Sequence, residues 1–192
     1  MGYFDLKIHK RDIETLLDNI KSNDPDSDLS LVSKAYYYAA NSHKNQKRLS
    51  GEPYITHPLE VAIILSKLKM DPVTISAALL HDVVEDTGTT LEVITNEFNK
   101  DIALLVDGVT KISDIKNKSK ASAQAETLRK MLIATIKDVR VIIIKLADKL
   151  HNMRTIIFQK PEKQERISKE TMDIYAPIAR RLGMSQISSE LE

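Results

Sequence analysis

The segment HDVVEDT, which begins at His81, combines residue types that can carry out metal-assisted hydrolysis. It follows the apolar run Val73–Leu80 and holds His81 and Asp82 side by side, with Glu85 and Asp86 one helical turn further on. Ionisable groups at the end of a buried segment are costly unless a partner satisfies them, and a metal ion is such a partner for imidazole and carboxylate. Two acidic groups one turn away can orient or deprotonate a water. The segment therefore predicts a hydrolytic metal site.

Four candidate ligands stand where an apolar stretch meets a polar one: His57, His81, Asp82 and Asp148. The sequence has no cysteine, which excludes thiolate ligands and disulfides. Two imidazoles and two carboxylates suit Mn²⁺, Fe²⁺ or Zn²⁺ better than Ca²⁺. Taken singly, His57 is better explained as a helix cap and Asp148 as the ion-pair partner of a neighbouring lysine. The prediction of a metal centre therefore depends on the combination.

The polar loop that leads to His57 is a candidate phosphate site. Its basic and hydrogen-bonding residues are His43, Lys44, Lys47, Arg48, Ser50 and Gly51. Clustered positive charge neutralises phosphate, and serine and glycine add a hydroxyl group and a close backbone approach. Tyr54 is a candidate to stack on a nucleotide base or to pack against its own loop, while Asn152 and Arg154 are candidates for base and phosphate contacts. A solvated basic loop without a ligand is the alternative.

The bulk composition predicts a single helical domain spanning residues 1–192. With 42% hydrophobic and 29% charged residues the chain can build a substantial core, and its five glycines and six prolines argue against a loop-rich or β-rich fold. The net charge of +1 gives no general attraction to nucleic acid or membranes, so neither is expected as a partner. The N-terminus lacks the apolar core of a signal peptide and no apolar run reaches membrane-spanning length, so we expect a cytoplasmic protein.

Hydrophobic periodicity, caps and prolines predict helices over 11–21, 28–42, 58–69, 72–82, 89–99, 101–110, 122–136, 139–153 and 161–182. Asp28 is the predicted cap of one helix, and Thr89 with Glu92 is the predicted capping box of another. The run VRVIIIKL at 139–146 favours a strand locally through its β-branched residues. The chain offers no second strand to pair with it, so we predict a buried helix. Segment 114–124, rich in lysine and serine, is predicted to be a loop that gates the site.

A series of longer motifs resembles the hydrolase domain of the RelA/SpoT family, whose members make and destroy guanosine tetra- and pentaphosphate (ppGpp and pppGpp). The motifs are YAANSHKNQKRLSGEPYITHP, AALLHDVVEDT, LVDGVTKI, LRKML, VIIIKLADKLHNMRT and KQERISKETMDIYAPIARRLG. They run from about residue 30 to the end of the chain, and their number and order are far more specific than a single His-Asp pair.

The resemblance implies an all-α domain of the HD superfamily that removes the 3′-pyrophosphate of its substrate, which gives GDP or GTP and pyrophosphate. It implies that Mn²⁺ is held by His57, His81, Asp82 and Asp148, and that Glu85 and Asp86 act on the hydrolytic water. It assigns nucleotide contacts to Arg48, Ser50, Tyr54, Asn152 and Thr155. One departure is Leu49, where many relatives carry a second basic residue after the loop arginine, and this weakens a substrate contact without touching the chemistry.

Other functions stay open at this point. A related HD-type phosphohydrolase would act on deoxynucleotides or cyclic dinucleotides. The Glu85–Asp86 pair and the LSGEPY loop instead favour the alarmones ppGpp and pppGpp as substrates. A non-catalytic alarmone sensor would not need the intact ligand set, and a purely structural helical module would leave the polar clustering unexplained. We expect the chain to be part of a longer bifunctional protein, because a synthetase domain follows the YAPIARRLG motif in those relatives. The oligomeric state and the preference between ppGpp and pppGpp stay open.

Overall fold

The protein is all-helical in the part that a computed structural model describes, which is residues 6–113 and 120–192. No strand occurs among these residues, which confirms the predicted fold class. The helices form two compact units: the first comprises Met1–Gln46 and Pro53–Asp107, and the second Lys47–Glu52 and Gly108–Glu192. A membrane-crossing helix would need more length and more apolar character than any described helix has. That the whole chain acts as one domain remains a prediction.

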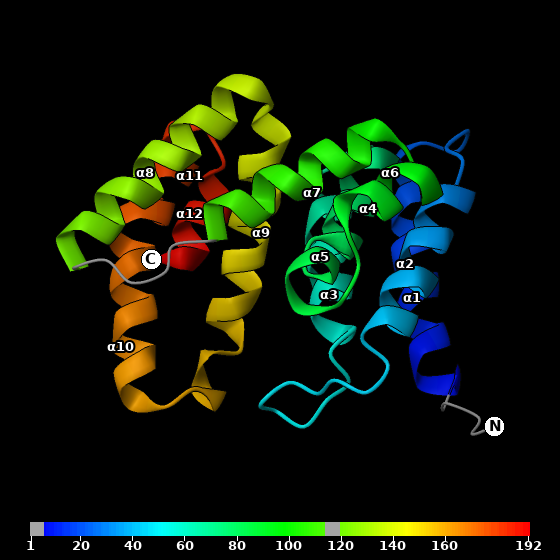
Figure 1. The fold of residues 1–192 in the computed structure, drawn as a ribbon, viewed down its shortest axis with the longest axis horizontal. Coiled ribbons are helices and arrows are strands. Elements are labelled where there is room, and N and C mark those ends of the chain that lie inside the picture. Colours follow the sequence, from blue (N-terminus) through cyan, green and yellow to red (C-terminus); the bar gives the residue numbers. More distant parts are fainter. Residues whose placement is uncertain (1–5, 114–119) are drawn as a thin grey trace. The chain divides into compact units, whose positions relative to one another are not determined.

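The first unit is built around a helix that is buried on all sides. Its elements are α1 (Leu6–Asn23), α2 (Ser30–Ser42), α3 (Thr56–Lys67), α4 (Pro72–Leu80), α5 (Val83–Asp86), α6 (Leu91–Glu97) and the first part of α7 (Lys100–Ser113). Helix α4 packs against α2 and α3, and α1 lies beside the same two helices (Figure 1). Residues 74–80 of α4 are all buried, including Thr74 and Ser76, so this helix belongs to the core, and the His-Asp pair follows its C-terminal end.

Capping explains where the helices of the first unit begin. Asp71 caps the start of α4, because its Oδ1 accepts from the backbone N of Thr74 at 3.0 Å. The predicted capping box of α6 is wrong by one residue: Thr90 is the cap, and its Oγ1 accepts from the backbone N of Val93 at 3.3 Å. Thr90 is the last residue with extended backbone, so its side chain, and not that of Thr89, faces the first turn.

The start of α2 also differs from the prediction. The helix begins at Ser30, so Leu29 stands at the cap position that was predicted for Asp28. Asp28 nevertheless serves this helix end, because its Oδ1 accepts from the backbone N of Ser30 at 2.8 Å. The hydrogen bonds from Ser30 hold the pKa of the Asp28 carboxyl below its usual range.

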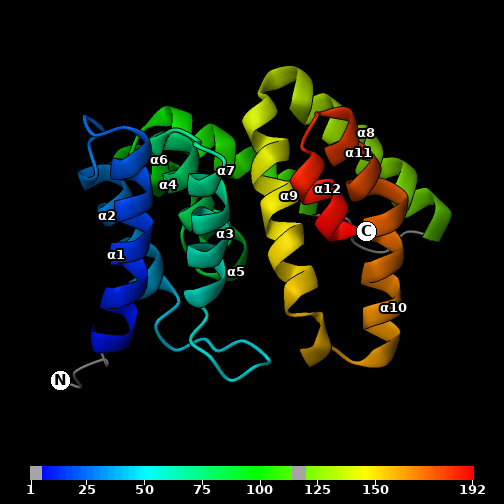
Figure 2. The ribbon, with the colours of Figure 1, turned by 180° about the vertical axis from the view of Figure 1, so that it is seen from behind.

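The second unit is organised around α9 (Val139–Arg154), which packs against α8 (Lys120–Lys137) and α12 (Ser185–Leu191) (Figure 2). The predicted buried helix is therefore confirmed in the run that also resembled a strand. Asp138 caps it by accepting from the backbone N of Arg140 at 2.9 Å. Burial of Ile142 and Ile144 supplies the packing that overrides the local strand preference of β-branched residues.

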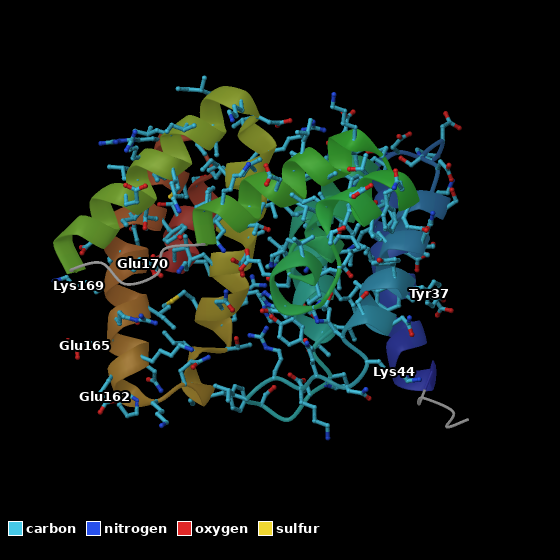
Figure 3. All side chains as sticks on the ribbon, viewed as in Figure 1. Tyr37, Lys44, Glu162, Glu165, Lys169 and Glu170 are labelled. Carbon is cyan, nitrogen blue, oxygen red and sulfur yellow. The ribbon has the colours of Figure 1, made fainter. Side chains whose placement is uncertain are left out.

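The predicted helix 161–182 is one continuous helical segment with an irregularity in it. It consists of α10 (Pro161–Glu170), the π-helical turn η2 (Thr171–Tyr175) and α11 (Ala176–Arg181), and the single-turn η1 (Ile156–Phe158) precedes it. Figure 3 labels four charged side chains that lie along α10: Glu162, Glu165, Lys169 and Glu170. The sequence reading missed α12, a seven-residue helix held by the buried Ile187 and Leu191.

Residues 114–119 of the predicted gating loop lie outside the described residues, and the described chain resumes with α8 at Lys120. The gating role stays a prediction.

Candidate metal centre and nucleotide contacts

The imidazole ring of His81 is buried and held in a fixed orientation. It follows α4 directly, and its side chain is 1% exposed. Its Nδ1 lies 2.7 Å from the carbonyl oxygen of Ala78. A carbonyl can only accept, so Nδ1 carries the proton and donates, and Nε2 keeps the lone pair that a metal requires. Nε2 lies 3.1 Å from Asp82 Oδ1.

His57 approaches the same carboxylate from α3. Its backbone N donates to the carbonyl of Tyr54 at 3.0 Å, and its side chain is 3% exposed. Its Nε2 lies 3.6 Å from Asp82 Oδ2, and its ring centroid lies 5.4 Å from that of His81. The first unit thus brings together three of the four predicted ligands. Two buried imidazoles around one carboxylate are a donor set that fits a divalent transition-metal ion.

Asp148, the fourth predicted ligand, belongs to the second unit. It is 4% exposed on α9. Its Oδ2 accepts from Lys145 Nζ at 2.6 Å, and its Oδ1 accepts from Asn152 Nδ2 at 2.6 Å. The ion pair that the sequence offered as the alternative role of Asp148 is therefore present. The assignment of Asp148 to the metal centre stays a prediction from the sequence.

The Tyr54 hydroxyl lies between two acidic groups of the HDVVEDT segment. Its Oη is 2.9 Å from Asp82 Oδ2 and 2.7 Å from Asp86 Oδ2. Burial, followed by the negative charges of Asp82 and Asp86, raises the pKa of the Tyr54 phenol well above its ordinary value. The phenol is therefore a stable hydrogen-bond donor to these carboxylates. Tyr54 was predicted either to stack on a nucleotide base or to pack against its own loop. The second role is observed, because the centroids of the stacked Tyr54 and His43 rings lie 4.5 Å apart.

Glu85 and Asp86 occupy α5, a single turn beyond the His-Asp pair. The backbone N of Asp86 donates to the carbonyl of Asp82 at 2.9 Å, so the helical geometry assumed for this segment is present at these positions. Both acidic side chains are exposed. An exposed carboxylate next to buried ligands is accessible to water and substrate, as the predicted role on a hydrolytic water requires.

Three predicted nucleotide contacts gather within the second unit. Arg48 Nη2 donates to Asn152 Oδ1 at 3.4 Å and to Thr155 Oγ1 at 3.3 Å. Arg48 comes from the short loop segment of that unit, and its two partners come from the end of α9. The predicted Ser50 donates instead within its loop, to Glu52 Oε2 at 2.9 Å. The guanidinium of Arg154 is engaged with the Glu190 carboxylate at 2.6 and 2.9 Å, which leaves the predicted phosphate contact without support.

Comparison with known proteins identifies the family. The sequence model of the HD domain matches residues 35–185, which is most of the chain. The chain belongs to the HD domain family. Within it, the chain is 53% identical over 183 residues to a GTP pyrophosphokinase of Streptomyces coelicolor, and 48% identical over 179 residues to the bifunctional (p)ppGpp synthase/hydrolase SpoT of Escherichia coli.

These alignments cover 94% and 93% of this HD domain chain, but only 21% and 26% of the two relatives. The chain therefore spans about a fifth to a quarter of the length of these curated relatives. A solved structure, described as a metazoan ortholog of SpoT that hydrolyzes ppGpp and plays a role in starvation responses, matches with a TM-score of 0.67 and 29% identity. That match covers 84% of this chain and 92% of the other. The predicted resemblance to the RelA/SpoT family is confirmed.

Sequence reasoning misplaced one residue of this HD domain and missed another. His43 was expected to add positive charge to the loop surface, but it is 2% exposed and packs beneath Tyr54. Gln46 was not singled out, yet its Nε2 donates to the backbone carbonyl of Asp86 at 2.8 Å. The available signal was the spacing of His43 and Gln46, three residues apart on a turn, which lets the two side chains meet.

Proposed function

We propose that this chain is the hydrolase domain of a RelA/SpoT-type protein. It removes the 3′-pyrophosphate of ppGpp or pppGpp and releases GDP or GTP with pyrophosphate. The observation that carries the proposal is the convergence of His57, His81 and Asp82 in the first unit, in a chain about half identical to relatives named for making or hydrolysing this alarmone. The HD domain match and the donor set support hydrolysis, and the names of the relatives support the substrate.

The proposed cofactor is Mn²⁺, with His57, His81, Asp82 and Asp148 as its ligands. When bound, the ion supplies Lewis acidity toward water and toward a phosphoryl oxygen. The carbonyl of Ala78 fixes the tautomer and the orientation of the His81 ring, which is the usual role of a group behind a metal-binding histidine. Imidazole donors favour a transition metal over Ca²⁺ or Mg²⁺.

Glu85 and Asp86 are the proposed acid–base groups. Glu85 is exposed and follows the ligand pair by one turn, so it can accept the proton of the attacking water. Asp86 is held by the Tyr54 hydroxyl at 2.7 Å, which leaves its second carboxylate oxygen to orient that water. We expect Glu85→Gln to lower kcat about 10²- to 10⁴-fold, the range of general acid–base catalysis, with Mn²⁺ affinity retained. Calorimetric Mn²⁺ titration beside single-turnover kinetics measures both, and unchanged turnover would remove Glu85 from the mechanism.

The nucleotide is assigned to the residues that gather in the second unit. Arg48 supplies a guanidinium that neutralises pyrophosphate charge, and its contacts with Asn152 and Thr155 preorder these side chains for the guanosine. Ser50 and Tyr54 are the further proposed contacts. Leu49 is 69% exposed, so the departure from the usual basic residue changes the loop surface and leaves the ligand set intact.

The deciding experiment incubates the purified chain with ppGpp, with and without Mn²⁺, and separates the products by anion-exchange chromatography. Mn²⁺-dependent formation of GDP and pyrophosphate supports the proposal. A panel of deoxynucleoside triphosphates and cyclic dinucleotides run in parallel separates alarmone hydrolysis from that of other HD-type phosphohydrolases. Tight ppGpp binding without product formation would contradict the proposed hydrolase activity and would indicate a non-catalytic ppGpp sensor.

A further inference from the structure

The side chain of Gln46 joins two segments of the first unit that lie far apart in the sequence. Its Nε2 donates to the backbone carbonyl of Asp86 at 2.8 Å, forty residues away. Its own backbone carbonyl accepts from the backbone N of Tyr54 at 3.0 Å. One residue therefore fixes the backbone of Asp86 and the backbone of Tyr54, whose hydroxyl contacts the Asp86 carboxylate.

The orientation of the Gln46 amide is determined by its partners. Asp86 offers a carbonyl oxygen, which can only accept, so the amide nitrogen must face it and Oε1 must face His43. His43 Nδ1 lies 2.6 Å from this Oε1 and therefore donates. Among the described residues no hydrogen-bond partner reaches the buried His43 Nε2, so Gln46 is the polar anchor of the ring. The ring stacks on Tyr54 with an interplanar angle of 22°.

Tyr54 carries this arrangement to the acidic groups. Its ring rests on His43, and its hydroxyl has one proton to share between Asp82 Oδ2 at 2.9 Å and Asp86 Oδ2 at 2.7 Å. Asp86 is consequently held at three points: its backbone N by Asp82, its carbonyl by Gln46 and its carboxylate by Tyr54. A catalytic group needs this kind of support, because a small displacement of a general base costs much of its rate effect.

We propose that His43, Gln46 and Tyr54 form a positioning brace that holds Asp86 and Asp82 in the geometry for hydrolysis. The proposal rests on the proposed function for what the two acidic groups do, but the brace itself is a statement about contacts within the first unit. Gln46 contacts only the backbone of Asp86, whereas Tyr54 contacts the carboxylates of both Asp82 and Asp86. The two residues therefore have different expected effects on metal binding.

The test compares variants that remove the polar group of one brace residue each without adding charge. Gln46→Met keeps the length of the side chain but can neither donate to Asp86 nor accept from His43, so kcat should fall about 10- to 100-fold, the usual effect of losing a supporting group, while Mn²⁺ affinity and KM stay within about threefold. Tyr54→Phe keeps the ring on His43 but loses the hydroxyl, so it should lower kcat and Mn²⁺ affinity together. Equal changes in metal affinity for the two variants would overturn this division of roles.

The controls repeat each substitution away from the brace. Gln164 also donates its Nε2 to a backbone carbonyl, that of Gln159 at 2.8 Å, so Gln164→Met is the matched control for the lost amide. Tyr37 projects from α2 with 56% of its surface exposed, so Tyr37→Phe is the control for the lost hydroxyl (Figure 3). Both controls should retain wild-type kcat. His43→Asn, whose amide nitrogen can replace Nδ1 as donor to Gln46, should retain more activity than His43→Leu.

A second measurement separates failure of the brace from failure of the proposed function. Hydrogen–deuterium exchange of a peptide covering residues 82–87 needs no substrate. We expect faster exchange in Gln46→Met and Tyr54→Phe than in the wild type, and wild-type exchange in Gln164→Met and Tyr37→Phe. If wild-type protein does not hydrolyse ppGpp but the exchange pattern holds, the proposed function fails and the brace stands. Unchanged exchange in Gln46→Met would overturn the brace whatever the activity.

Discussion

The two units both bury ionisable side chains, but they balance the charge in different ways. In the first unit, two buried imidazoles face the Asp82 carboxylate at 3.1 and 3.6 Å. In the second unit, ammonium groups face carboxylates. Lys145 contacts Asp148 at 2.6 Å, and Lys149 contacts Glu170 at 3.1 Å. An ammonium group has no lone pair to offer a metal, whereas a neutral imidazole has one.

This difference shows which buried charges are balanced within the protein and which polar group is suited to a cation. Lys149 has both a carboxylate partner and the ring of Tyr175, whose centroid lies 4.3 Å from Nζ. Burial lowers the pKa of Lys149 and raises that of Tyr175, while the charge of Glu170 opposes the first shift. The carboxylates of Asp148 and Glu170 therefore balance the positive charges of Lys145 and Lys149 around α9. The imidazole–carboxylate group of the first unit is instead suited to a cation from outside.

The largest expected effect comes from removing the carboxylate at the centre of the first unit. Asp82→Ala should abolish Mn²⁺ binding and ppGpp hydrolysis together, because both imidazoles and the Tyr54 hydroxyl converge on Asp82. Calorimetry and product analysis on the same preparation measure the two losses. Glu190→Ala, which removes a carboxylate of the second unit that pairs with the exposed Arg154, is the control and should retain both properties. Retained Mn²⁺ binding in Asp82→Ala would contradict the conclusion that the imidazole–carboxylate group of the first unit holds the cation.

A smaller effect is expected from the basic residue that the second unit contributes. Arg48→Ala should raise KM for ppGpp about 10- to 100-fold, because a charge-assisted contact of roughly 1.5–3 kcal/mol is lost, with Mn²⁺ affinity unchanged. Steady-state kinetics measures the split between KM and kcat. A fall in kcat with unaltered KM would assign Arg48 to the transition state instead. Lys47→Ala, a neighbouring basic residue exposed on the same loop, tests whether general loop charge suffices.

The close packing of the second unit predicts an effect on stability at Gly108. A Cβ atom added there would lie 2.7 Å from Val141 Cγ2 and 3.1 Å from Cγ1, and Val141 is buried and stiff at its branched Cβ. Gly108→Ala should therefore destabilise the fold by about 1–3 kcal/mol, although alanine is the better helix former. Urea unfolding measures the change. Gly88→Ala, where the new Cβ meets nothing within 4 Å, is the control.

A double variant separates the clash from other causes. If the contact with Val141 is responsible, Gly108→Ala combined with Val141→Ala should lose less stability than the sum of the two single changes. Additive losses would show that the close approach of Gly108 to Val141 is not what selects glycine here.

The sequence allowed the prediction of most helices, because these depend on local patterns, and it singled out His57, His81 and Asp82, which the first unit brings together. The His-Asp pair after an apolar run required only residue types and spacing, and α4 required only its cap, its proline and its apolar residues. The strand-like run in α9 was assigned correctly because no partner strand existed for it. Local patterns could not reveal that Gln46 reaches Asp86, since that contact depends on the path of the loop between α2 and α3.

Other failures have equally specific causes. Thr89 and Thr90 are the same residue type, so only the backbone conformation determines which one caps α6. His43 looked like a surface charge because its neighbours in sequence are basic, yet stacking on Tyr54 and the bond to Gln46 bury it. The π-helical turn η2 ends two residues before Pro177, which lies inside the predicted helix 161–182. A proline has no N–H to donate and its ring clashes with the carbonyl four residues earlier, so Pro177 was the available signal for an irregular turn at this place.

The smallest expected effect compares the helix caps of the two units. Asp138 caps α9 and also contacts the guanidinium of Arg140 at 2.7 Å, whereas Asp71 caps α4 through uncharged Thr74 groups. Asp138→Ala should cost roughly 0.5–2 kcal/mol at neutral pH, as for other lost caps. Hydrogen bonds from Arg140 hold the folded pKa of Asp138 below 3.8, so this stabilisation is present above pH 3.8 and is lost as the pH falls through the folded value.

Urea unfolding of wild type and Asp138→Ala between pH 7 and pH 3 tests this prediction. The difference in free energy of unfolding should shrink toward the acidic end, and at neutral pH it should also decrease with added salt, because the Arg140 contact is partly exposed and therefore screened. Asp71→Ala at the same pH values is the control, and its cost at neutral pH should respond less to salt. An Asp138 effect that is insensitive to both pH and salt would assign the whole contribution to the backbone hydrogen bond, and the two caps would then be equivalent.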